Sequence, residues 1–305
     1  HLNLSGLIWF LIIDQLLIVT LRGKTIQTME LNDLIKYALA EDIGDGDHTS
    51  LSTIPSSAMG KARLIVKEEG ILAGMRVAPL VFERVDPSII FKPLLEDGTP
   101  IKPGDIAFIV EGPSISLLTS ERLVLNFMQR MSGIATITSH YAKELDGLHT
   151  KVIDTRKTTP LMRELEKESV RIGGGGNHRF GLFDMILIKD NHVDFAGGIK
   201  QAINAAQQYL QKTGKSLKIE IEVRNFDELN QVLLCGGVDR IMLDNFNPEM
   251  LTQAVKIIDG RYETEASGGI TLSTLRSYAL SGVDYISVGA LTHHIKSLDL
   301  SLKAF

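Results

Sequence analysis

The residues best suited to chemistry lie in a basic, glycine-rich segment between Lys151 and His192. This segment holds eight Lys or Arg residues against six Asp or Glu residues, a net charge of +2 in a chain whose total is −5. A local excess of cations in an acidic protein, with a pI of about 5.9, predicts a site for small anions. The same balance excludes a general nucleic-acid binder.

The first basic stretch, Asp154–Thr159, follows a short apolar run and contains Arg156 next to Lys157. A planar guanidinium suits a carboxylate bound by two hydrogen bonds, and a lysine ammonium suits a phosphate as a point charge. Two neighbouring cations on one loop could therefore hold two different anions. Taken alone, such a stretch is more often a solvated loop with surface charges.

The second stretch is the glycine run Gly173–Gly176, which is followed by Asn177, His178 and Arg179. Four glycines leave the backbone free to approach a ligand and to expose N–H groups to an anion. His178 and Arg179 supply further donors. A glycine run also occurs in flexible linkers, but linkers seldom carry His-Arg directly before a strand. We therefore interpret the run as part of a binding site.

The third stretch places Lys189 directly after four apolar residues, Met185–Ile188. An unpaired charge at the mouth of an apolar barrel is very costly, so this lysine needs a partner. The partner is either a ligand or an acidic side chain such as Asp190 or Glu222. We expect ligand binding.

Two carboxylates, Glu222 and Asp244, are expected at the ends of neighbouring strands. Glu220 shares a face with Glu222 through the two-residue period of a strand, but only Glu222 lies near the rim. Paired hard oxygens suit Mg²⁺ bound together with a diphosphate, or hydrogen bonds to ribose hydroxyls. Ion pairs with Lys157 or Lys189 are compatible with both interpretations.

Small residues follow the last two strands, namely Ser267, Gly268 and Gly269 in one place and Gly289 and Ala290 in the other. Each group precedes the start of a helix, a pattern typical of the phosphate site of α/β barrels. The pattern predicts a phosphate-bearing ligand. Gly289 alone would also be explained by close packing of a strand against a helix.

Parallel β–α units must position all these residues. From residue 151 onward, apolar strands alternate with helical patterns at intervals of roughly 20 to 30 residues, which is typical of α/β folds. Strands are expected at 152–153, 185–188, 219–223, 241–243, 262–266 and 285–288, and helices at 199–211, 226–235, 248–258 and 272–280. Polar or small residues end these strands: Asp154, Lys189, Glu222, Asp244, Ser267 and Gly289. No G-x-G-x-x-G fingerprint follows the first strand, so a barrel is favoured over a Rossmann fold.

A smaller domain of strands and helices is expected before the barrel, from residue 29 to 118. A helical pattern covers residues 31–40, and strands are expected at 62–66, 71–73 and 106–110, between turn signals such as Asp97-Gly98. A long helix is expected to open near Thr119, whose side chain suits an N-cap, and to start a barrel domain of residues 119–290. Residues 291–305 are expected to pack back on the N-terminal domain.

Residues 1–28 form an apolar extension outside this pattern. A membrane span needs roughly 20 apolar residues, and Asp14 and Gln15 interrupt the apolar run. A signal peptide would need a basic start and a small-residue cleavage site. We therefore expect no membrane anchor. The single cysteine, Cys235, excludes an intrachain disulfide and a cysteine metal cluster, and it favours a reducing, cytoplasmic location.

Taken together, these motifs resemble the quinolinate phosphoribosyltransferase family, the decarboxylating nicotinate-nucleotide pyrophosphorylases of NAD synthesis. The resemblance runs from about Leu31 to the C-terminus. The stretches that carry it are Asp154–Pro160, Gly173–Arg179, Leu187–His192, Met242–Asn245 and Gly289–His293.

The resemblance implies an α/β fold in which an N-terminal α/β sandwich domain joins an irregular, incomplete α/β barrel. The reaction it implies combines quinolinate with phosphoribosyl pyrophosphate to give nicotinate mononucleotide, pyrophosphate and CO₂, with Mg²⁺ as the cofactor. It also implies a homodimer or a higher homo-oligomer with shared active sites, in which Arg122 reaches into the neighbouring site. Neither a nucleic-acid partner nor a membrane partner is expected.

The resemblance further assigns roles to single residues. Those that would bind quinolinate are Arg122, Thr155, Arg156, His178 and Arg179. Those that would bind the phosphoribosyl group and its phosphates are Lys157, Lys189, Ser267, Gly268, Gly269, Gly289, Ala290 and His293. The catalytic residues would be Lys157, Lys189, Glu222 and Asp244, of which Glu222 and Asp244 would also be the metal ligands.

Two alternatives stay open at this point. The first is a homologue of the same fold with another acceptor, such as the decarboxylase-like molybdenum-associated relatives, although Arg122, Arg156 and Arg179 together favour a dicarboxylate. The second is a carrier or binding module, because Ile101–Asp105 resembles the turn of biotinyl or lipoyl domains. No Met-Lys-Met attachment hairpin accompanies that turn, and a carrier would leave the barrel unexplained.

Overall fold

A computed structural model describes residues 30–305, so the expectations for residues 1–28 lie outside the described residues. The chain divides into two compact units, one ending at Gly46 and the other running from Asp47 to Phe305. Within the first unit the described residues form helix α2 (Leu31–Ile43), whose buried residues Leu31, Ile35 and Leu39 follow the helical spacing of the sequence.

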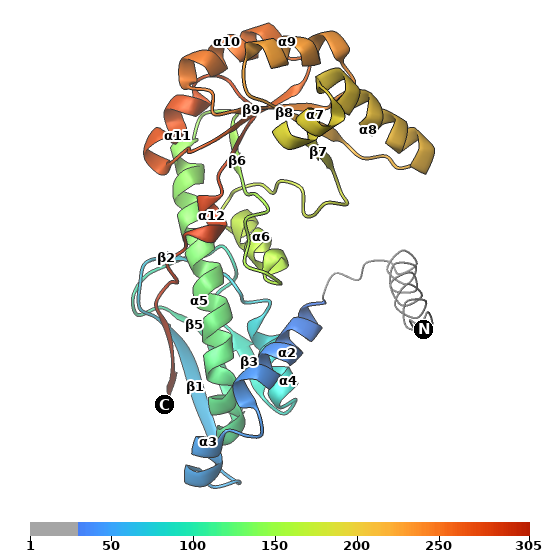
Figure 1. The fold of residues 1–305 in the computed structure, drawn as a ribbon. Coiled ribbons are helices and arrows are strands. Elements are labelled where there is room, and N and C mark those ends of the chain that lie inside the picture. The colour runs from blue at the N-terminus through green and yellow to red at the C-terminus, as the bar shows by residue number, and fades with distance from the viewer. Residues whose placement is uncertain (1–29) are drawn as a thin grey trace, which may run out of the picture. The chain divides into compact units, whose positions relative to one another are not determined.

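The second unit begins with an antiparallel sheet, coloured blue to cyan in Figure 1 apart from its C-terminal strand. Its strands are β1 (Met59–Val66), β3 (Ile90–Pro93), β5 (Ile106–Pro113) and β12 (Leu300–Ala304), in the order β12-β1-β5-β3. The last strand of the chain thus pairs with the first strand of this sheet, Leu302 opposite Leu64. A separate pair consists of β2 (Gly70–Ile71) and β4 (Pro100–Ile101).

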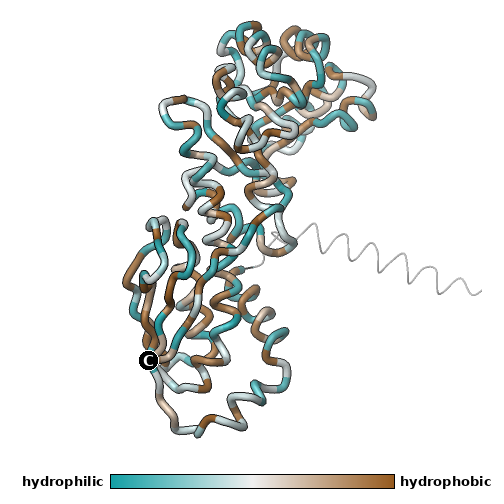
Figure 2. The backbone as a smooth tube through the Cα atoms, turned by 90° about the vertical axis from the view of Figure 1, so that its left-hand side faces the viewer, coloured by the Kyte–Doolittle hydropathy of each residue, from teal (hydrophilic) through white to brown (hydrophobic). Residues whose placement is uncertain are grey.

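Helices α3 (His48–Thr53) and α4 (Ala78–Val85) complete this domain. The ring of Phe82 on α4 meets that of Phe108 on β5 edge to face, with the ring centroids 5.9 Å apart, so α4 packs on the sheet through aromatic side chains. Figure 2 shows hydrophobic stretches along the strands near the C-terminus. The domain therefore consists of an antiparallel sheet with helix α4 packed on it.

Helix α5 (Ser114–Glu144) connects the sheet domain with the parallel strands that follow, and it lies beside α6 and α12 (Figure 1). The predicted start near Thr119 was wrong, because the helix begins at Ser114 directly after β5 and Pro113 precedes its first turn. Proline is tolerated there, since the first N–H groups of a helix have no intrahelical partner. Thr119 lies inside the helix, and its hydroxyl donates to Asp47 Oδ2 at 3.1 Å.

The second sheet is parallel and consists of β6 (Lys151–Ile153), β7 (Ile186–Ile188), β8 (Ile219–Val223), β9 (Arg240–Asp244), β10 (Glu263–Ser267) and β11 (Tyr285–Ser287). Its helices are α6 (Arg163–Ile172), α7 (Asp190–Ala196), α8 (Ile199–Thr213), α9 (Phe226–Cys235), α10 (Pro248–Ile258), α11 (Leu272–Ala279) and α12 (Ala290–His293). The strand order is β6-β11-β10-β9-β8-β7, so β6, the first of these strands in the sequence, pairs with β11, the last, as in a barrel. The predicted α/β barrel class is confirmed.

The barrel is incomplete between β6 and β7, which do not pair among the described residues. The end of the glycine run lies beside β6 instead, where Gly176 N–H donates to Val152 O at 2.8 Å and Asp154 N–H donates to Gly176 O at 3.1 Å. A short segment without a regular strand therefore covers the edge of β6. This gap is the irregularity that the family resemblance implies.

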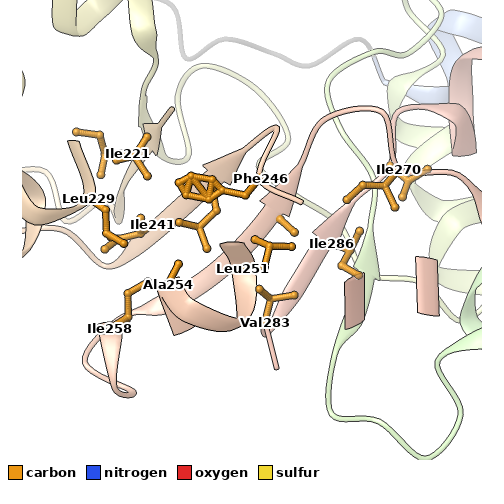
Figure 3. Packing of buried hydrophobic residues seen from close by; sticks show 14 of the residues in the cluster. Ile221, Leu229, Ile241, Phe246, Leu251, Ala254, Ile258, Ile270, Val283 and Ile286 are labelled. Atoms are coloured by element: carbon orange, nitrogen blue, oxygen red, sulfur yellow. The ribbon is translucent and has the colours of Figure 1, made fainter. Parts of the chain in front are cut away.

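The strands separate an apolar outer face from a charged inner face. On β8, Ile219, Ile221 and Val223 belong to the hydrophobic core with the surrounding helices, and Figure 3 shows Ile221, Ile241 and Phe246 in this cluster. The alternate residues point the other way because the side chains of a strand alternate between its two faces. These alternate residues are Glu220 and Glu222 on β8, Arg240, Met242 and Asp244 on β9, and Glu263, Glu265 and Ser267 on β10. Among residues 30–305, no helix combines the length and apolarity that a membrane span requires.

Candidate active site

Asp154, the residue after β6, is an anchor rather than a free ligand. Its side chain is fully buried and accepts hydrogen bonds from Lys167 Nζ at 2.5 Å, Asn177 Nδ2 at 2.6 Å and the His178 backbone N–H at 2.9 Å. Burial raises the pKa of Asp154, and the charge of Lys167 opposes that rise. This residue therefore fixes the start of the Arg156 loop against the His178 segment.

Two residues of the glycine run, Gly173 and Gly175, pack closely against α5. A Cβ on Gly173 would collide with Ala135 O of α5, and one on Gly175 would lie 2.8 Å from Thr138 Cγ2. Both glycines are thus required by close packing against α5, and the approach of the run to a ligand stays a prediction. The consequence for the site is indirect, because this packing sets where His178 and Arg179 lie.

Arg156 and Arg179 are neighbouring cations in the barrel site. Arg179 is only 8% exposed, and burial together with the charge of Arg156 lowers the pKa of its guanidinium. One nitrogen of Arg179 donates to Met185 O at 3.1 Å, while Arg156 Nε is buried and has no hydrogen-bond partner in this part of the chain. Two neighbouring guanidiniums with unused donors suit a ligand that carries two carboxylates.

The ring of His178 points to the barrel interior. Its Nδ1 accepts a hydrogen bond from the Arg179 backbone N–H at 2.6 Å, and its Nε2 lies 3.0 Å from Glu220 Oε2 and 3.5 Å from Glu265 Oε2. Because Nδ1 is an acceptor, the proton of the neutral imidazole lies on Nε2. Burial lowers the pKa of His178, which favours this neutral form. Its assignment as a quinolinate ligand stays a prediction.

The three side chains of His178, Glu220 and Glu265 lie close enough to one another to hold a metal ion. One contact already occupies this group, because Arg240 donates to Glu265 Oε2 at 3.1 Å. Burial and the neighbouring Glu220 raise the pKa of Glu265 to about 8. The raised pKa favours a protonated Glu265 in this interior cluster near neutral pH.

A second set of carboxylates lies at the rim of the barrel, and Glu222, Asp244 and Ser267 together form what we call the rim layer. Asp244 is opposite Ser267 in the register, and Glu222 is opposite Met242 on the adjoining strand. Glu222 is half-buried, and both burial and the charge of Asp244 raise its pKa, while the charge of Lys189 lowers it. A pair of oxygen donors with excess negative charge, open at the rim, has the chemistry of a Mg²⁺ site.

The Gly268–Gly269 turn after β10 is held by Asn245. Asn245 N–H donates to Ser267 O at 2.9 Å, and Asn245 Nδ2 donates to Asp244 Oδ2 at 2.6 Å. Gly268 has φ +102° and Gly269 has φ +62°, backbone conformations that favour glycine. The turn thus leaves exposed backbone next to the rim carboxylates, where a phosphate could approach.

Lys157 lies beside the turn that follows β11 and contains Gly289. A Cβ on Gly289 would lie 3.0 Å from Lys157 Cδ and 2.9 Å from His293 Nε2, and the charge of Lys157 contributes to a lowered pKa of His293. The Thr292 hydroxyl donates to Lys157 O at 2.7 Å. The structure therefore brings together Lys157, Gly289 and His293, three residues that the resemblance assigns to phosphate binding.

Lys189 lies at the end of β7, near Glu222, whereas Arg122 lies away from the barrel site of its own chain. Lys189 is exposed at the start of α7, where its backbone N–H donates to His192 Nδ1 at 3.0 Å, and its charge acts on Glu222. Arg122 is exposed on α5, and among residues 30–305 no hydrogen bond or ion pair joins it to the barrel site. It precedes Arg130 by eight residues, or about 12 Å along the helix. Arg122 therefore lies well before the part of α5 that meets the site of its own chain.

A cavity of about 370 Å³ adjoins Arg179 on the α7 and α8 side of β7. Its only charged lining residue among the described residues is Arg179, and His192 is its other polar one. The remaining lining residues are apolar: Leu182, Met185, Ile186, Leu187, Ile188, Ala196, Ala202 and Ala205. The cavity gives Arg179 an apolar flank, but it does not include the rim layer.

Sequence reasoning missed the residues that hold the loops in place. Arg130 of α5 donates to Glu166 Oε1 at 2.8 Å and to Thr159 Oγ1 at 2.8 Å, and Arg163 donates to Thr158 Oγ1 at 3.0 Å. A signal was available for the pair Glu166-Lys167, which the helical period places on the apolar face of α6. Counting the segment's charges could not show that several of its cations are already paired.

The sequence of the chain is similar to that of known proteins over most of its length. The family model described as quinolinate phosphoribosyl transferase, C-terminal domain, matches residues 134–303, and the corresponding N-terminal domain model matches residues 47–132. The chain is 44% identical over 292 residues to quinolinate phosphoribosyltransferase [decarboxylating] 1b of Nicotiana tabacum, covering 90% of this chain and 83% of the relative.

A bacterial relative and a solved structure agree with this. The probable nicotinate-nucleotide pyrophosphorylase [carboxylating] of Bacillus subtilis is 42% identical over 274 residues, covering 90% of this chain and 93% of the relative. The crystal structure of NadC from Streptococcus pyogenes superposes with a TM-score of 0.86 at 39% identity, covering 92% of this chain and 98% of that one. The similarity thus extends over both the antiparallel sheet domain and the barrel.

Proposed function

The chain belongs to the quinolinate phosphoribosyltransferase family, and from this premise we propose how its residues carry out the family's reaction. It is a pentosyltransferase of de novo NAD synthesis, which transfers the phosphoribosyl group of phosphoribosyl pyrophosphate to quinolinate with decarboxylation. The products are nicotinate mononucleotide, pyrophosphate and CO₂. The roles of individual residues, the metal and the assembly are our proposals.

The Arg156–Arg179 pair is the observation that carries the substrate assignment. Quinolinate has two carboxylates on adjacent ring carbons, and two neighbouring guanidiniums can meet both. An opposite charge at about 4 Å contributes on the order of 4 kcal/mol at an effective dielectric near 20, enough to fix the orientation of the ring. Thr155 lies on the same loop as Arg156, and His178 orients Arg179 through its backbone contact.

Lys157, Gly289, Ala290 and His293 are proposed to bind phosphate groups at one side of the rim, with Ser267, Gly268 and Gly269 beside them. The closeness of Lys157 to Gly289 and His293 supports this assignment. Lys189 is proposed to balance the negative charge at Glu222 while it contacts the diphosphate or the pyridine ring. Cations placed between the two anionic substrates reduce their mutual repulsion.

The rim carboxylates, Glu222 and Asp244, are proposed to stabilise the ribose as the bond to pyrophosphate breaks. Departure of pyrophosphate leaves positive charge on the ribose ring, which nearby carboxylates favour. The same two oxygen donors would hold Mg²⁺, which would supply charge neutralisation of the diphosphate. Attack by the pyridine nitrogen makes the ring cationic, so the ring stabilises the electron pair that the departing CO₂ leaves on the adjacent carbon. A proton from water then adds to that carbon and gives nicotinate mononucleotide. Catalysis on this proposal is mainly positioning and electrostatics.

The distance of Arg122 from the barrel site of its own chain supports the proposal that it serves a second copy. We propose a homodimer, or a higher homo-oligomer, in which Arg122 of the partner subunit completes the dicarboxylate site. The single cysteine is consistent with a protein that functions in a reducing compartment such as the cytoplasm.

Binding of quinolinate to the Arg156→Ala variant tests the substrate assignment. Loss of a two-pronged charged contact costs about 1.5–3 kcal/mol or more, so the affinity should fall at least about 10-fold while the protein stays folded. Arg84→Ala, a change of an exposed arginine on α4, is the matched control. Unchanged affinity in Arg156→Ala would rule out this carboxylate site.

Mixing subunits tests the shared site. Arg122→Ala and Arg156→Ala subunits, each inactive alone, should regain part of the activity in a mixed dimer because one of its two sites then keeps both arginines. A verified mixed dimer without activity would count against Arg122 acting across the interface.

A further inference from the structure

Helix α6 lies between the two loops that carry the proposed quinolinate-binding arginines. Arg163, Glu166 and Lys167 follow the spacing i, i+3 and i+4, which places them on one face of the helix. Glu166 and Lys167 are only 1% and 2% exposed, and Arg163 is half-buried. Charged side chains are rarely buried to this extent unless they are paired. The hydrogen-bond partners of these three side chains therefore show which segments α6 holds in place.

Lys167 joins the end of β6 to the His178 segment. Its ammonium donates to Asp154 Oδ1 at 2.5 Å and to His178 O at 3.0 Å. The Asn177 side chain completes this link, since it donates both to Asp154 Oδ2 at 2.6 Å and to Lys167 O at 2.9 Å. One buried lysine thus holds the backbone on both sides of the gap in the barrel.

Arg163 and Glu166 hold the loop that carries Arg156. Arg163 Nε donates to Thr158 Oγ1 at 3.0 Å, and another nitrogen of the same guanidinium donates to Phe180 O at 3.1 Å. Glu166 Oε2 accepts the Thr159 backbone N–H at 3.1 Å. Arg163 therefore spans both loops, and Glu166 holds the first of them.

Arg130 adds a fixed point on α5. It donates to Glu166 Oε1 at 2.8 Å and also reaches Thr159 Oγ1 at 2.8 Å and Thr292 O at 3.2 Å. Thr292 in turn donates to Lys157 O at 2.7 Å. The same network therefore connects α6, the Arg156 loop and the segment that follows Gly289.

We propose that α6 is the positioning helix of this active site, and that its face of Arg163, Glu166 and Lys167 sets the separation of Arg156 and Arg179. This inference rests on the function proposed above. Two neighbouring guanidiniums repel each other without a ligand, so loops that carry them would separate unless something held them. The hydrogen bonds of α6 supply that restraint before quinolinate binds, which reduces the cost of binding. These residues are positioning residues and do not touch the substrate.

Glu166→Gln tests the proposal, with Glu168→Gln as the matched control. A glutamine keeps the size of the side chain, but it cannot accept both from Arg130 and from the Thr159 N–H in the way that two carboxylate oxygens do. Glu168 lies on the same helix and also accepts from an arginine, Arg76 at 2.7 Å, outside the site. The quinolinate dissociation constant is measured by calorimetry at a temperature at which every variant is folded by circular dichroism.

We expect quinolinate to bind Glu166→Gln about 10-fold more weakly than wild type, as loss of a buried charged hydrogen bond from the loop predicts. Glu168→Gln should bind like wild type, even if its melting temperature falls. Equal dissociation constants for the two variants at the measuring temperature would overturn the positioning role and leave α6 a purely structural helix. Wild-type protein that fails to bind quinolinate would instead reject the proposed function, and the role of α6 would fall with it.

Arg163→Lys keeps the test decisive if Glu166→Gln does not fold. Lysine retains the charge at a half-buried position, but one ammonium cannot make the forked contact to Thr158 and Phe180. Weaker quinolinate binding in Arg163→Lys, with unchanged binding in the surface control Arg84→Lys, supports the proposal. Wild-type affinity in a folded Arg163→Lys protein contradicts it.

Discussion

The Gly268–Gly269 turn offers a matched pair of substitutions whose effects can be worked out from the backbone. Gly269 has φ +62°, and a Cβ there would meet nothing within 4 Å. Gly269→Ala should therefore cost only the left-handed penalty of about 1–2 kcal/mol, partly offset by a less flexible unfolded chain. Gly268 has φ +102°, and its added Cβ would lie 2.9 Å from the Asn245 backbone N and closer still to Asn245 Oδ1.

Two terms then add for Gly268→Ala. The unfavourable φ costs about 1–3 kcal/mol, and pushing the Asn245 backbone away costs about a further 1–3 kcal/mol. Gly268→Ala should thus be less stable than Gly269→Ala by about 2–3 kcal/mol. At roughly 2–4 °C per kcal/mol for a domain of this size, the melting temperatures should differ by about 4–12 °C.

The displacement also has a consequence for function. Asn245 holds Ser267 through its backbone and Asp244 through its side chain, so a shift of Asn245 disturbs the rim layer. The KM for phosphoribosyl pyrophosphate should rise in Gly268→Ala more than the KM for quinolinate. Melting curves and steady-state kinetics measure both effects. Equal melting temperatures for the two alanine variants would refute the packing argument at Asn245.

Three further outcomes follow from the buried charges and the proposed metal. Asp154→Asn and Lys167→Met should each cost about 3–5 kcal/mol in urea unfolding, whereas the double variant should recover most of the loss; additive losses would contradict the ion pair. Burial raises the pKa of Glu265 to about 8 from an ordinary 4.5, so its contribution to stability is complete below pH 4.5 and is lost as pH rises through 8. The melting temperature of Glu265→Gln minus that of wild type should consequently increase between pH 5 and pH 9. A difference that stays constant over this range would be inconsistent with that pKa. Removal of divalent cations by EDTA should abolish turnover without changing the melting temperature of the ligand-free protein, and only undiminished turnover would exclude the metal.

The sequence predicted the barrel well because its signals are local. The alternation of Ile219–Val223 and the caps of α9 and α10, Asn225 and Asn247, are readable from the order of residues alone. The start of α5 was not, because its N-cap is Pro113, which has no capping side chain, whereas Thr119 inside the helix is a suitable cap residue.

Within the site, the sequence predicted which residue types gather but not how they are paired. Arg156 and Arg179 are near each other as expected, since both follow elements at the same rim. The ring of His178, however, points to Glu220 inside the barrel, and Gly173 and Gly175 pack closely against α5. Such long-range contacts depend on the tertiary structure, so no spacing within the segment could show them.

The central claim is tested most directly by incubating the purified protein with phosphoribosyl pyrophosphate, Mg²⁺ and either quinolinate or nicotinate. Quinolinate should give nicotinate mononucleotide and an equal amount of CO₂. Nicotinate should give no nucleotide, because it lacks the second carboxylate for the Arg156–Arg179 pair. Nucleotide formed from nicotinate as readily as from quinolinate, or no product from quinolinate at all, would contradict this claim.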